Sequence, residues 1–326
     1  MRARDSHKND SDNKWFGYIY PKNLEKQEVA KLLVPRLVAN LGCFADDRGR
    51  YYCDNVDVGG VVPRRADDIW LLAGVLNAPV SNTIFGWLSK PFRGDYKSAN
   101  KQFIAPLPVP KATRTERAAL SALAKGMQQR RTLRVTLSSD LEERLCAVAR
   151  ANLPLERILP GVRPTLEIEE TAPKSIGGRD RKAWADAQRN ADEESALAQI
   201  DGLIHPASEA SVALERGKLS FLIDEREVAR LFVSEAEAAL VEAQWRAAAL
   251  DFQPSGKGDS KRLVNRLRRL AIVAPAALAE QIISTGARLA ELTAALRDDE
   301  AQLHDLTCLL FNLSDDERQL VERGKN

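Results

Sequence analysis

The stretch KQFIAPLPVP, at residues 101–110, constrains the fold most because it separates two parts of different composition. Its three prolines alternate with apolar residues, which suits a spacer, a ligand for a proline-binding domain, or the closing edge of a folded module. Phe103, Ile104 and Leu107 are available for burial, so we favour an edge strand whose prolines face away from the ladder. Pro110 would then end the module before a helix begins.

Aromatic residues lie mainly before this stretch. All five tyrosines, three of the five tryptophans and five of the nine phenylalanines precede residue 111. The rest of the chain is rich in Ala, Leu, Glu and Arg, which are strong helix formers. We therefore expect an α+β protein, with a small mixed sheet and helices followed by a mainly α-helical C-terminal region.

The net charge of +2 is unevenly distributed. Residues 1–150 contain 25 Lys or Arg and 16 Asp or Glu, whereas residues 151–326 contain 23 and 30. A basic half joined to an acidic half indicates different partners, and a polyanion suits the first. Ordinary surface variation explains the same asymmetry equally well.

The pattern of residues predicts four regions. They are a mobile tail at 1–14, an α+β unit at 15–110, connecting helices at 111–150, and a mainly helical part at 151–326. Within the α+β unit, Pro35 argues that KLLVPRLV (31–38) is an edge strand. Residues 43–56 are predicted to form a hairpin, and VGGVVP (58–63) a further short strand.

Helical periodicity starts after the third strand. It begins in ADDIWLL, is interrupted at Asn77-Ala78-Pro79, and resumes over residues 80–89, before a polar loop at 91–102. Prolines and Gly177-Gly178 predict an irregular connector over 151–180. Further helices are expected from TRTE (113–116), over 234–250, after a basic Gly/Ser loop in 254–273, and over 275–300 and 301–323 with a break at Asn312.

Motifs for the common chemistries are missing. The sequence contains neither a dinucleotide-binding Gly-x-Gly-x-x-Gly nor a Walker-type loop, and SGKGDSK (255–261) has the wrong spacing for one. The three histidines are isolated, which argues against metal ligation and histidine-based nucleophilic triads. EIEE (167–170) with Lys174 is interpreted as a solvated charge run. We expect no catalytic residue and no metal site in this chain.

The four cysteines, Cys43, Cys53, Cys146 and Cys308, are scattered without metal-ligand spacing and fit a reducing cytoplasm. Cys43 and Cys53 would pair across a hairpin only as the alternative to buried free thiols. The polar start MRARDSHKNDSDNK lacks the apolar core of a secretion signal, and no apolar run approaches the ~20 residues that span a bilayer. A cytoplasmic location is expected.

The order of these segments resembles a known family. KLLVPRLV, FADDRGRYYCDNV, LLAGVLNAPVSN and FRGDYKSANKQFIAPLPVP resemble the TaqI-like C-terminal specificity domain of adenine-N6 DNA methyltransferases and type IIG restriction-modification enzymes. LHDLTCLLFNLSDDERQLVE (303–322) is similar to the end of large restriction-modification polypeptides. The resemblance covers roughly residues 15–110 and 285–323.

The resemblance implies that residues 15–110 form a DNA target-recognition domain that grips double-stranded DNA. In that family a separate catalytic domain binds S-adenosylmethionine and carries an Asn/Asp-Pro-Pro-aromatic motif. This chain has no Pro-Pro pair, so S-adenosylmethionine is expected on a catalytic part that is missing here. Either a partner methyltransferase or restriction subunit supplies catalysis, or the chain is the C-terminal part of a longer enzyme. A non-DNA helical scaffold built on residues 111–326 is the alternative from another class.

DNA contacts are predicted from residue chemistry. Lys and Arg contact phosphates, whereas Arg, Lys, Asn and Gln also read base edges. The first choice is KPFRGDYKSANKQ (90–102), which offers Lys90, Arg93, Lys97, Asn100, Lys101 and Gln102, with Phe92 and Tyr96 as packing or stacking groups. Arg64 and Arg65 are the second choice, and Arg48 and Arg50 the third.

Two further interpretations concern side chains outside this set. Trp70, Trp87 and Tyr52 are expected in the core. The basic stretch Lys257, Lys261, Arg262, Arg266, Arg268 and Arg269 would touch phosphate or form salt bridges between helices, and the sequence does not separate the two.

Overall fold

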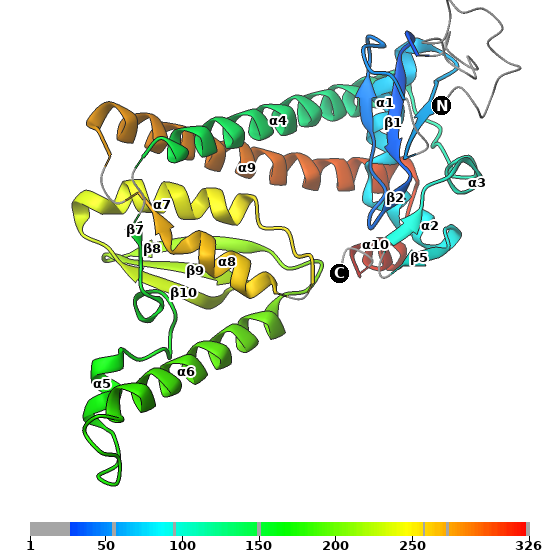
Figure 1. Cartoon of the computed structure of the whole chain (residues 1–326). Coiled ribbons are helices and arrows are strands. Elements are labelled where there is room, and N and C mark those ends of the chain that lie inside the picture. The colour runs from blue at the N-terminus through cyan, green and yellow to red at the C-terminus, as the bar shows by residue number, and fades with distance from the viewer. Residues whose placement is uncertain are drawn as a thin grey trace, which may run out of the picture. The chain divides into compact units, whose positions relative to one another are not determined.

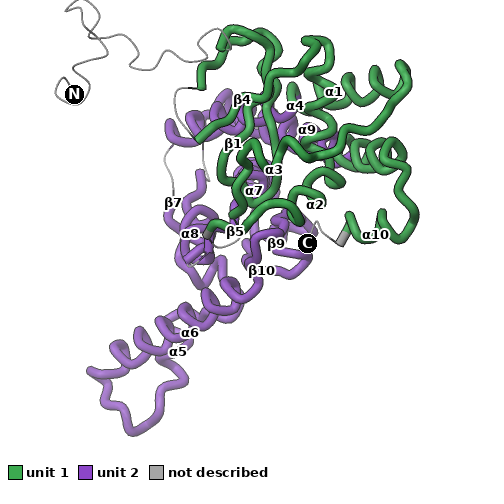
Figure 2. The backbone as a smooth tube through the Cα atoms, turned by 90° about the vertical axis from the view of Figure 1, so that its right-hand side faces the viewer, with its two compact units in different colours: residues 1–129, 299–326 green, residues 130–298 purple. Residues whose placement is uncertain are grey.

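The computed structural model describes residues 27–53, 57–93, 96–148, 151–256, 258–271 and 274–323, so the predicted tail at 1–14 lies outside the described residues. Two compact units divide the chain, unit 1 (1–129 and 299–326) and unit 2 (130–298), as Figure 2 shows. The chain passes into unit 2 within helix α4 (Arg114–Cys146) and returns within α9 (Ala276–Leu310) (Figure 1). The expected α+β class is confirmed, while the functional boundaries proposed from the sequence stay a prediction.

Unit 1 contains two small antiparallel sheets. The first has the order β3-β1-β4 and consists of β1 (Lys31–Pro35), β3 (Phe44–Asp46) and β4 (Val58–Val61). The second has the order β2-β6-β5 and consists of β2 (Leu37–Val38), β5 (Pro91–Arg93) and β6 (Tyr96–Ser98). Arg36 joins them, because its N–H donates to Asp57 O and its carbonyl accepts from the Ala99 N–H, both at 2.7 Å.

The edge position predicted for residues 31–38 is wrong for β1, which is the central strand of its sheet. Pro35 is the last residue of β1, opposite Val58. A missing N–H interrupts the ladder only at its end there, which is why proline is tolerated. The chain then continues into β2, and that short strand does lie at a sheet edge.

The helices of unit 1 pack on its sheets and on one another. They are the short η3 (Ala66–Asp68), α1 (Ile69–Leu76), α2 (Pro79–Leu88) and α3 (Lys101–Ile104), with the first part of α4, the last turns of α9, and α10 (Asp315–Arg323). The predicted interruption between α1 and α2 is confirmed. Asn77 fills it, accepting the Cys43 N–H at 2.8 Å and donating to Cys43 O at 3.1 Å. The break therefore ties the helices to the sheet.

The core of unit 1 has two adjoining parts. Leu32, Val34 and Phe85 are fully buried where the sheets meet α1 and α2. A second cluster joins α1 to α4 and to the end of α9, through Leu71, Leu120 and Leu303. Burying each of these side chains contributes about 1.5–3 kcal/mol.

The hairpin predicted over 43–56 is wrong. β3 supplies the first arm, but it pairs with β1, and Tyr51 to Cys53 are not in a strand. The reason is the Asp46 carboxylate, which accepts the N–H groups of Arg50 and Tyr51, both at 2.9 Å. These donors are no longer available for a ladder, and residues 54–56 lie outside the described residues.

The edge strand predicted for residues 101–110 is also wrong. Asn100 precedes one turn of helix, α3, and its carbonyl accepts the N–H groups of Phe103 and Ile104. Pro106 cannot continue the helix, and the chain runs without regular structure to α4. Leu107 is buried, as expected, so the stretch still closes this part of unit 1. The polar loop predicted just before it contains the β5–β6 pair.

Unit 2 is built on a three-stranded antiparallel sheet that the sequence analysis did not predict. It has the order β10-β9-β8, with β8 (Ala210–Glu215), β9 (Lys218–Ile223) and β10 (Arg226–Phe232). The expected connector contains η4 (Leu155–Arg157) and α5 (Thr165–Glu170), and α6 (Arg181–Leu203) follows it. The remaining elements are α7 (Glu235–Leu250), α8 (Asp259–Leu267) and the paired β7 (Ala151–Asn152) and β11 (Arg269–Leu270).

α7 packs on this sheet through Trp245, which is fully buried. The indole meets Phe221 of β9 edge to face at 6.2 Å, and its Nε1 donates to Leu267 O at 3.3 Å. The helix begins after Ser234, as predicted, because the Glu237 carboxylate accepts both the N–H and the hydroxyl of Ser234.

The C-terminal helices differ from expectation in one respect. α9 runs unbroken from Ala276 to Leu310, so the boundary expected at residue 300 is absent. The break at Asn312 is confirmed, where the backbone has a φ of 53°. In the described parts of the chain no single helix is long and apolar enough to cross a membrane, although residues 66–76 and 79–88 taken together, bent by 75°, have that apolar length.

Candidate nucleic-acid interface

A cleft of about 530 Å³ lies in unit 1 between β4 and α3. Its walls are apolar, and Gly59 and Gly60 of β4 expose backbone to it. Three polar side chains line it, those of Arg36, Asn100 and Lys101. Asn100 and Lys101 belong to the predicted DNA contacts, whereas Arg36 was missed.

Local backbone structure places these three residues. The Arg36 carbonyl binds the N–H of Ala99, so the residue before Asn100 is fixed to the junction of the two sheets. Asn100 is extended, and α3 starts with Lys101 at once after it. Pro35 was the available signal, because a proline inside an apolar run marks the point where the strand leaves one sheet.

The β5–β6 pair carries the other residues of the first-choice segment. Arg93 ends β5 opposite Tyr96, and Pro91 lies opposite Lys97. Side chains alternate along a strand, so Tyr96 and Lys97 point to opposite faces of β6. Lys97 is half-buried, and a Cβ added at Gly86 of α2 would lie 3.1 Å from its Nζ. Its ammonium group therefore lies beside α2.

The remaining candidates are exposed but spread out. Lys90 and Gln102 are exposed beside the same elements. Arg64 and Arg65 follow β4, and Arg48 and Arg50 lie in the turn after β3; all four are exposed. β1 separates β3 from β4, so the two arginine pairs lie at opposite edges of the sheet. The cleft thus brings together Asn100 and Lys101 but none of the four arginines.

A buried ion pair holds the turn that carries Arg48 and Arg50. Lys31 Nζ donates to Asp46 Oδ2 at 2.9 Å and to Gln27 O at 2.5 Å, with Lys31 and Asp46 both almost fully buried. Burial raises the pKa of Asp46, but the Tyr51 N–H, the Lys31 ammonium and the Arg50 N–H outweigh it and hold that pKa below its ordinary value. Asp46 is therefore charged and fixes the turn.

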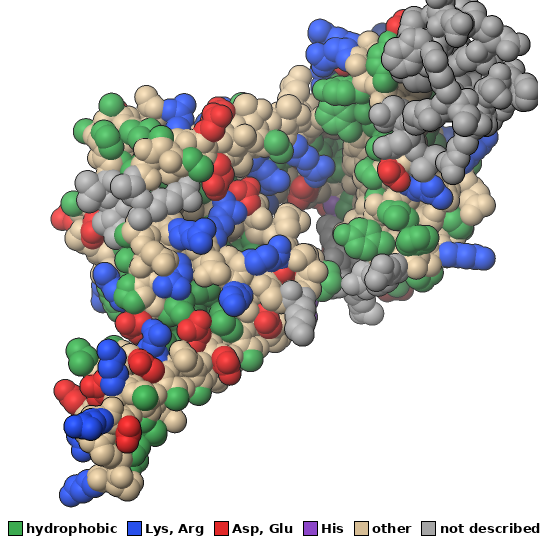
Figure 3. Space-filling model, viewed as in Figure 1, with side chains coloured by type: hydrophobic (Ala, Val, Ile, Leu, Met, Phe, Trp, Pro, Cys, Tyr) green, Lys and Arg blue, Asp and Glu red, His purple; other side chains and the backbone are tan. Residues whose placement is uncertain are grey.

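Exposed aromatic side chains adjoin the β5–β6 pair. Trp87, Phe92 and Tyr96 have exposed fractions of 66, 68 and 55%. Hydrophobic side chains are visible in Figure 3 where Figure 1 places β2, α2 and β5. The core position predicted for Trp87 is wrong because it follows buried Phe85 by two residues, about 200° around the helix.

The other two residues expected in the core behave differently. Tyr52 is exposed, and its hydroxyl donates to Glu28 at 2.5 Å, so its predicted core position is wrong as well. Trp70 is half-buried, with the Lys125 ammonium 5.7 Å from its ring centroid.

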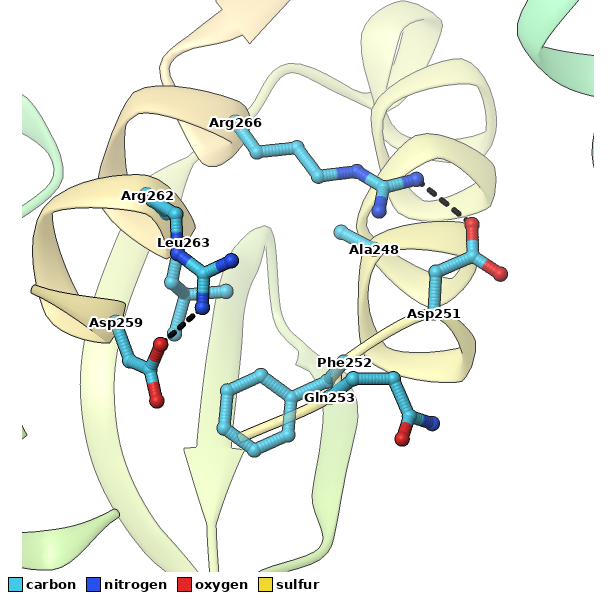
Figure 4. A pocket seen from close by; sticks show the side chains of 8 residues that line it. All are labelled: Ala248, Asp251, Phe252, Gln253, Asp259, Arg262, Leu263 and Arg266. Atoms are coloured by element: carbon cyan, nitrogen blue, oxygen red, sulfur yellow. Dashed lines mark hydrogen bonds and ion pairs between the residues drawn. The ribbon is translucent and has the colours of Figure 1, made fainter. Parts of the chain in front are cut away.

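The phosphate-like loop of unit 2 is filled by its own chain. Asp259 accepts the N–H groups of Ser255 and Gly256 at 2.6 and 2.8 Å and the Ser255 hydroxyl at 2.8 Å, and Arg262 pairs with it (Figure 4). Burial raises the pKa of Asp259, but these hydrogen bonds lower it further, to about 2. A carboxylate thus occupies the place of an anion, in agreement with the absence of a Walker motif.

Internal contacts account for much of the basic stretch in unit 2. Arg266 pairs with Glu142 at 2.6 Å and with Asp251 at 2.9 Å, beside a pocket of about 180 Å³ (Figure 4). Arg268 donates to Leu153 O at 2.8 Å. Lys261 and Arg269 are exposed, and Lys257 lies outside the described residues. Salt bridges and caps within unit 2 therefore explain Arg262, Arg266 and Arg268.

The described metal-ligating residues and the cysteines are spread over the fold. Among the described residues no three His, Cys, Asp or Glu side chains form a group that would hold a metal ion. Cys308 is buried and Cys146 is exposed, whereas Cys43 and Cys53 are only half-buried, so the burial expected for these two is wrong. Comparison of the chain with models of protein families, with curated proteins and with solved structures found no match.

Proposed function

We propose that this chain is a sequence-specific DNA-binding specificity module of a restriction-modification system. It would direct adenine-N6 methylation by a catalytic domain that is not present in this chain. The observation that carries the proposal is the cleft of unit 1, where Arg36, Asn100 and Lys101 line one cavity. A second, open hollow continues over Asn100, Lys101 and Gln102.

The side chains around these hollows divide between the two tasks of DNA recognition. Lys101 offers a point charge to a phosphate, which gives affinity without sequence information. Asn100 and Gln102 carry amides, which pair bidentately with adenine N6 and N7 in the major groove. Arg36 has the fork that suits guanine O6 and N7, or a phosphate.

Charge favours a polyanion at this part of unit 1. Residues 85–105 contain four Lys or Arg and one Asp in the sequence. Lys90 and Lys101 are exposed and have no acidic partner among the described residues. Unpaired cations beside a cleft attract phosphate and raise the rate of association with DNA.

Methyl transfer requires another part. The chain has no Pro-Pro pair, and hence no Asn-Pro-Pro-aromatic motif of the kind that holds a target adenine. A methyltransferase or restriction subunit that binds S-adenosylmethionine would catalyse methyl transfer, and this chain would select the DNA sequence. With S-adenosylmethionine and DNA, the chain alone is expected to transfer no methyl group.

The first test measures affinity against salt. Fluorescence anisotropy with a random-sequence duplex of about two helical turns should give a line of log K against log salt concentration. Removing Lys90 and Lys101 together by alanine should reduce its slope by up to about 1.8, at about 0.9 for each phosphate contact. Lys182→Ala, an exposed lysine of unit 2 outside the candidate phosphate contacts, is the matched control and should leave the slope unchanged. Failure to bind duplex DNA even at low salt would refute the proposal.

The second test separates recognition of the base sequence from non-specific attraction to the phosphates. Selection from a random duplex library should yield a preferred sequence, and Asn100→Ala should relax one position of it by about 1–3 kcal/mol. Lys101→Ala should weaken all sequences by the same factor. Equal weakening of every sequence by Asn100→Ala would show that this amide does not read a base.

A further inference from the structure

We infer that Trp87, Phe92 and Tyr96, which we call the aromatic platform, stack an unpaired base of the DNA that unit 1 binds. The inference rests on the proposed function and adds the form in which the DNA is held. The three side chains come from ten residues of sequence, on the last turn of α2, on β5 and on β6.

Exposing aromatic side chains to water on this scale is energetically unfavourable. More than half of each of the three aromatic side chains is open to solvent. Large apolar side chains exposed on neighbouring elements of a folded protein often mark a binding site. Leu88, on the same turn of α2 as Trp87, is also 41% exposed.

The platform is held in place by contacts between α2 and β6. The Ser89 hydroxyl donates to Ser98 O at 2.8 Å, and Ser89 is buried. Lys97 places its Nζ beside Gly86, on the other side of Trp87 in the sequence. The end of α2 and strand β6 therefore keep a fixed geometry, so binding would cost little ordering of the backbone.

The composition around the platform favours nucleic acid over a protein partner. Lys90, Lys97 and Lys101 accompany the three aromatic residues in the sequence. Lysine is depleted in protein–protein interfaces, whereas alternating cations and aromatic rings are typical of surfaces that bind unpaired nucleic acid. Lys90 and Lys101, which are both exposed, would follow the phosphates while the rings stack on bases.

Stacking further specifies an unpaired base. Within a duplex each base face is covered by its neighbours, so an aromatic ring gains contact only where a base has left the stack. Chemistry at the N6 atom of adenine also requires that the base be rotated out of the duplex. A platform in the recognition unit would stabilise the opened DNA while the separate catalytic part acts.

The experiment compares three probes with the full chain. They are a random-sequence duplex, the same duplex with a central loop of three unpaired adenines, and the single strand. The looped duplex should bind more tightly than the paired one. A 2-aminopurine placed in the loop should lose fluorescence when the chain binds, because stacking quenches it.

Variants assign the effect to the platform. Phe92→Ala and Tyr96→Ala should each weaken binding of the looped duplex by about 5- to 150-fold, the range for loss of one stacked base, and affect the paired duplex far less. Phe92→Trp should retain the preference. Phe232→Ala is the matched control, because Phe232 lies on β10 of unit 2 and is also 66% exposed.

The outcomes separate this inference from the proposed function. Equal affinity for paired and looped duplexes, with the lysine dependence intact, would overturn the platform and leave the DNA-binding proposal standing. Equal losses of both probes in Phe92→Ala, or no loss of either, would overturn it too, and the second result would point to a protein partner. A chain that binds none of the three probes would refute both proposals.

Discussion

Replacing Lys31 by methionine isolates the buried ion pair of unit 1. Methionine keeps an unbranched apolar stem of similar length, so the change removes the ammonium group with little loss of packing. Lys31 is 1% exposed and its Nζ lies 2.9 Å from Asp46 Oδ2. Asp46 would stay behind as a buried carboxylate, still bound by the N–H groups of Arg50 and Tyr51.

The loss follows from the geometry. At 2.9 Å and an effective dielectric constant of about 20, the attraction is about 6 kcal/mol before desolvation is subtracted. Removing one partner of a buried pair typically costs about 3–5 kcal/mol, because the other charge is left uncompensated. The two backbone hydrogen bonds to Asp46 compensate part of that charge, so we expect the lower end, about 3 kcal/mol.

Urea unfolding of the full chain, followed by circular dichroism and tryptophan fluorescence, measures this loss. Lys261→Met removes an exposed lysine and should change the free energy of unfolding by less than about 0.5 kcal/mol. Adding Asp46→Asn to Lys31→Met should cost less than the sum of the two single changes, because no unpaired charge remains. A loss under 1 kcal/mol for Lys31→Met, or strict additivity, would refute the account of the pair.

Three further changes test packing, charge and backbone conformation by the same unfolding assay. Gly286→Ala should lower the free energy of unfolding by about 1–3 kcal/mol, because its Cβ would lie 2.8 Å from the Ala243 Cβ. Gly202→Ala places its Cβ in open space and should raise the free energy of unfolding by up to about 1 kcal/mol. The reverse order of stability would contradict the packing of α9 on α7. Asp259→Asn should lower the free energy of unfolding by about 2 kcal/mol at pH 7 and by almost nothing near pH 2. The reason is that a pKa lowered from 3.8 to about 2 adds stability above pH 4, which is lost as the pH falls through 2. A loss of stability that does not depend on pH would contradict this account of Asp259. Glu225→Gly should stabilise by about 1 kcal/mol, since Glu225 has a φ of 65° in a two-residue turn, and an unchanged or lower stability would show that no strain is stored there.

Features set by neighbouring residues could be predicted from the sequence. The break between α1 and α2 depends on Pro79, which starts the second helix because its missing N–H is not needed there. The start of α7 depends on Ser234 and Glu237, three residues apart. In both places the deciding contact lies within one helical turn, so the local pattern contained it.

Features set by residues that are distant in the sequence could not be predicted from it. The second arm of the predicted hairpin is absent because Asp46, itself held by Lys31, takes the backbone donors that a strand would need. Nothing near the turn DDRG in the sequence shows that an aspartate, rather than a strand, will accept those hydrogen bonds. Pro35 was likewise interpreted as an edge signal, although it ends a central strand.

The sheet of unit 2 was missed for a different reason. In KLSFLI the buried apolar residues Leu219, Phe221 and Ile223 recur at every second position of β9. REVARLF continues after a turn of two residues, Asp224 and Glu225. Both of these residues have positive φ, yet neither is glycine, so the usual composition of a tight hairpin turn was lacking. The period of two was also incomplete, because apolar Leu222 interrupts it in β9 and an irregularity between Glu227 and Ala229 interrupts it in β10.

The candidate site shows which residues could be predicted from side-chain chemistry alone, without knowledge of the fold. Lys90 to Gln102 were chosen as one contiguous basic segment, but the structure gives its members different roles, with Lys97 beside α2 and Asn100 and Lys101 lining the cleft. Arg36 joins the cleft from a position more than sixty residues earlier, because its own backbone carbonyl binds Ala99. The sequence alone does not distinguish Arg36 from any other arginine. The hydrogen bonds that join the two sheets at this residue do.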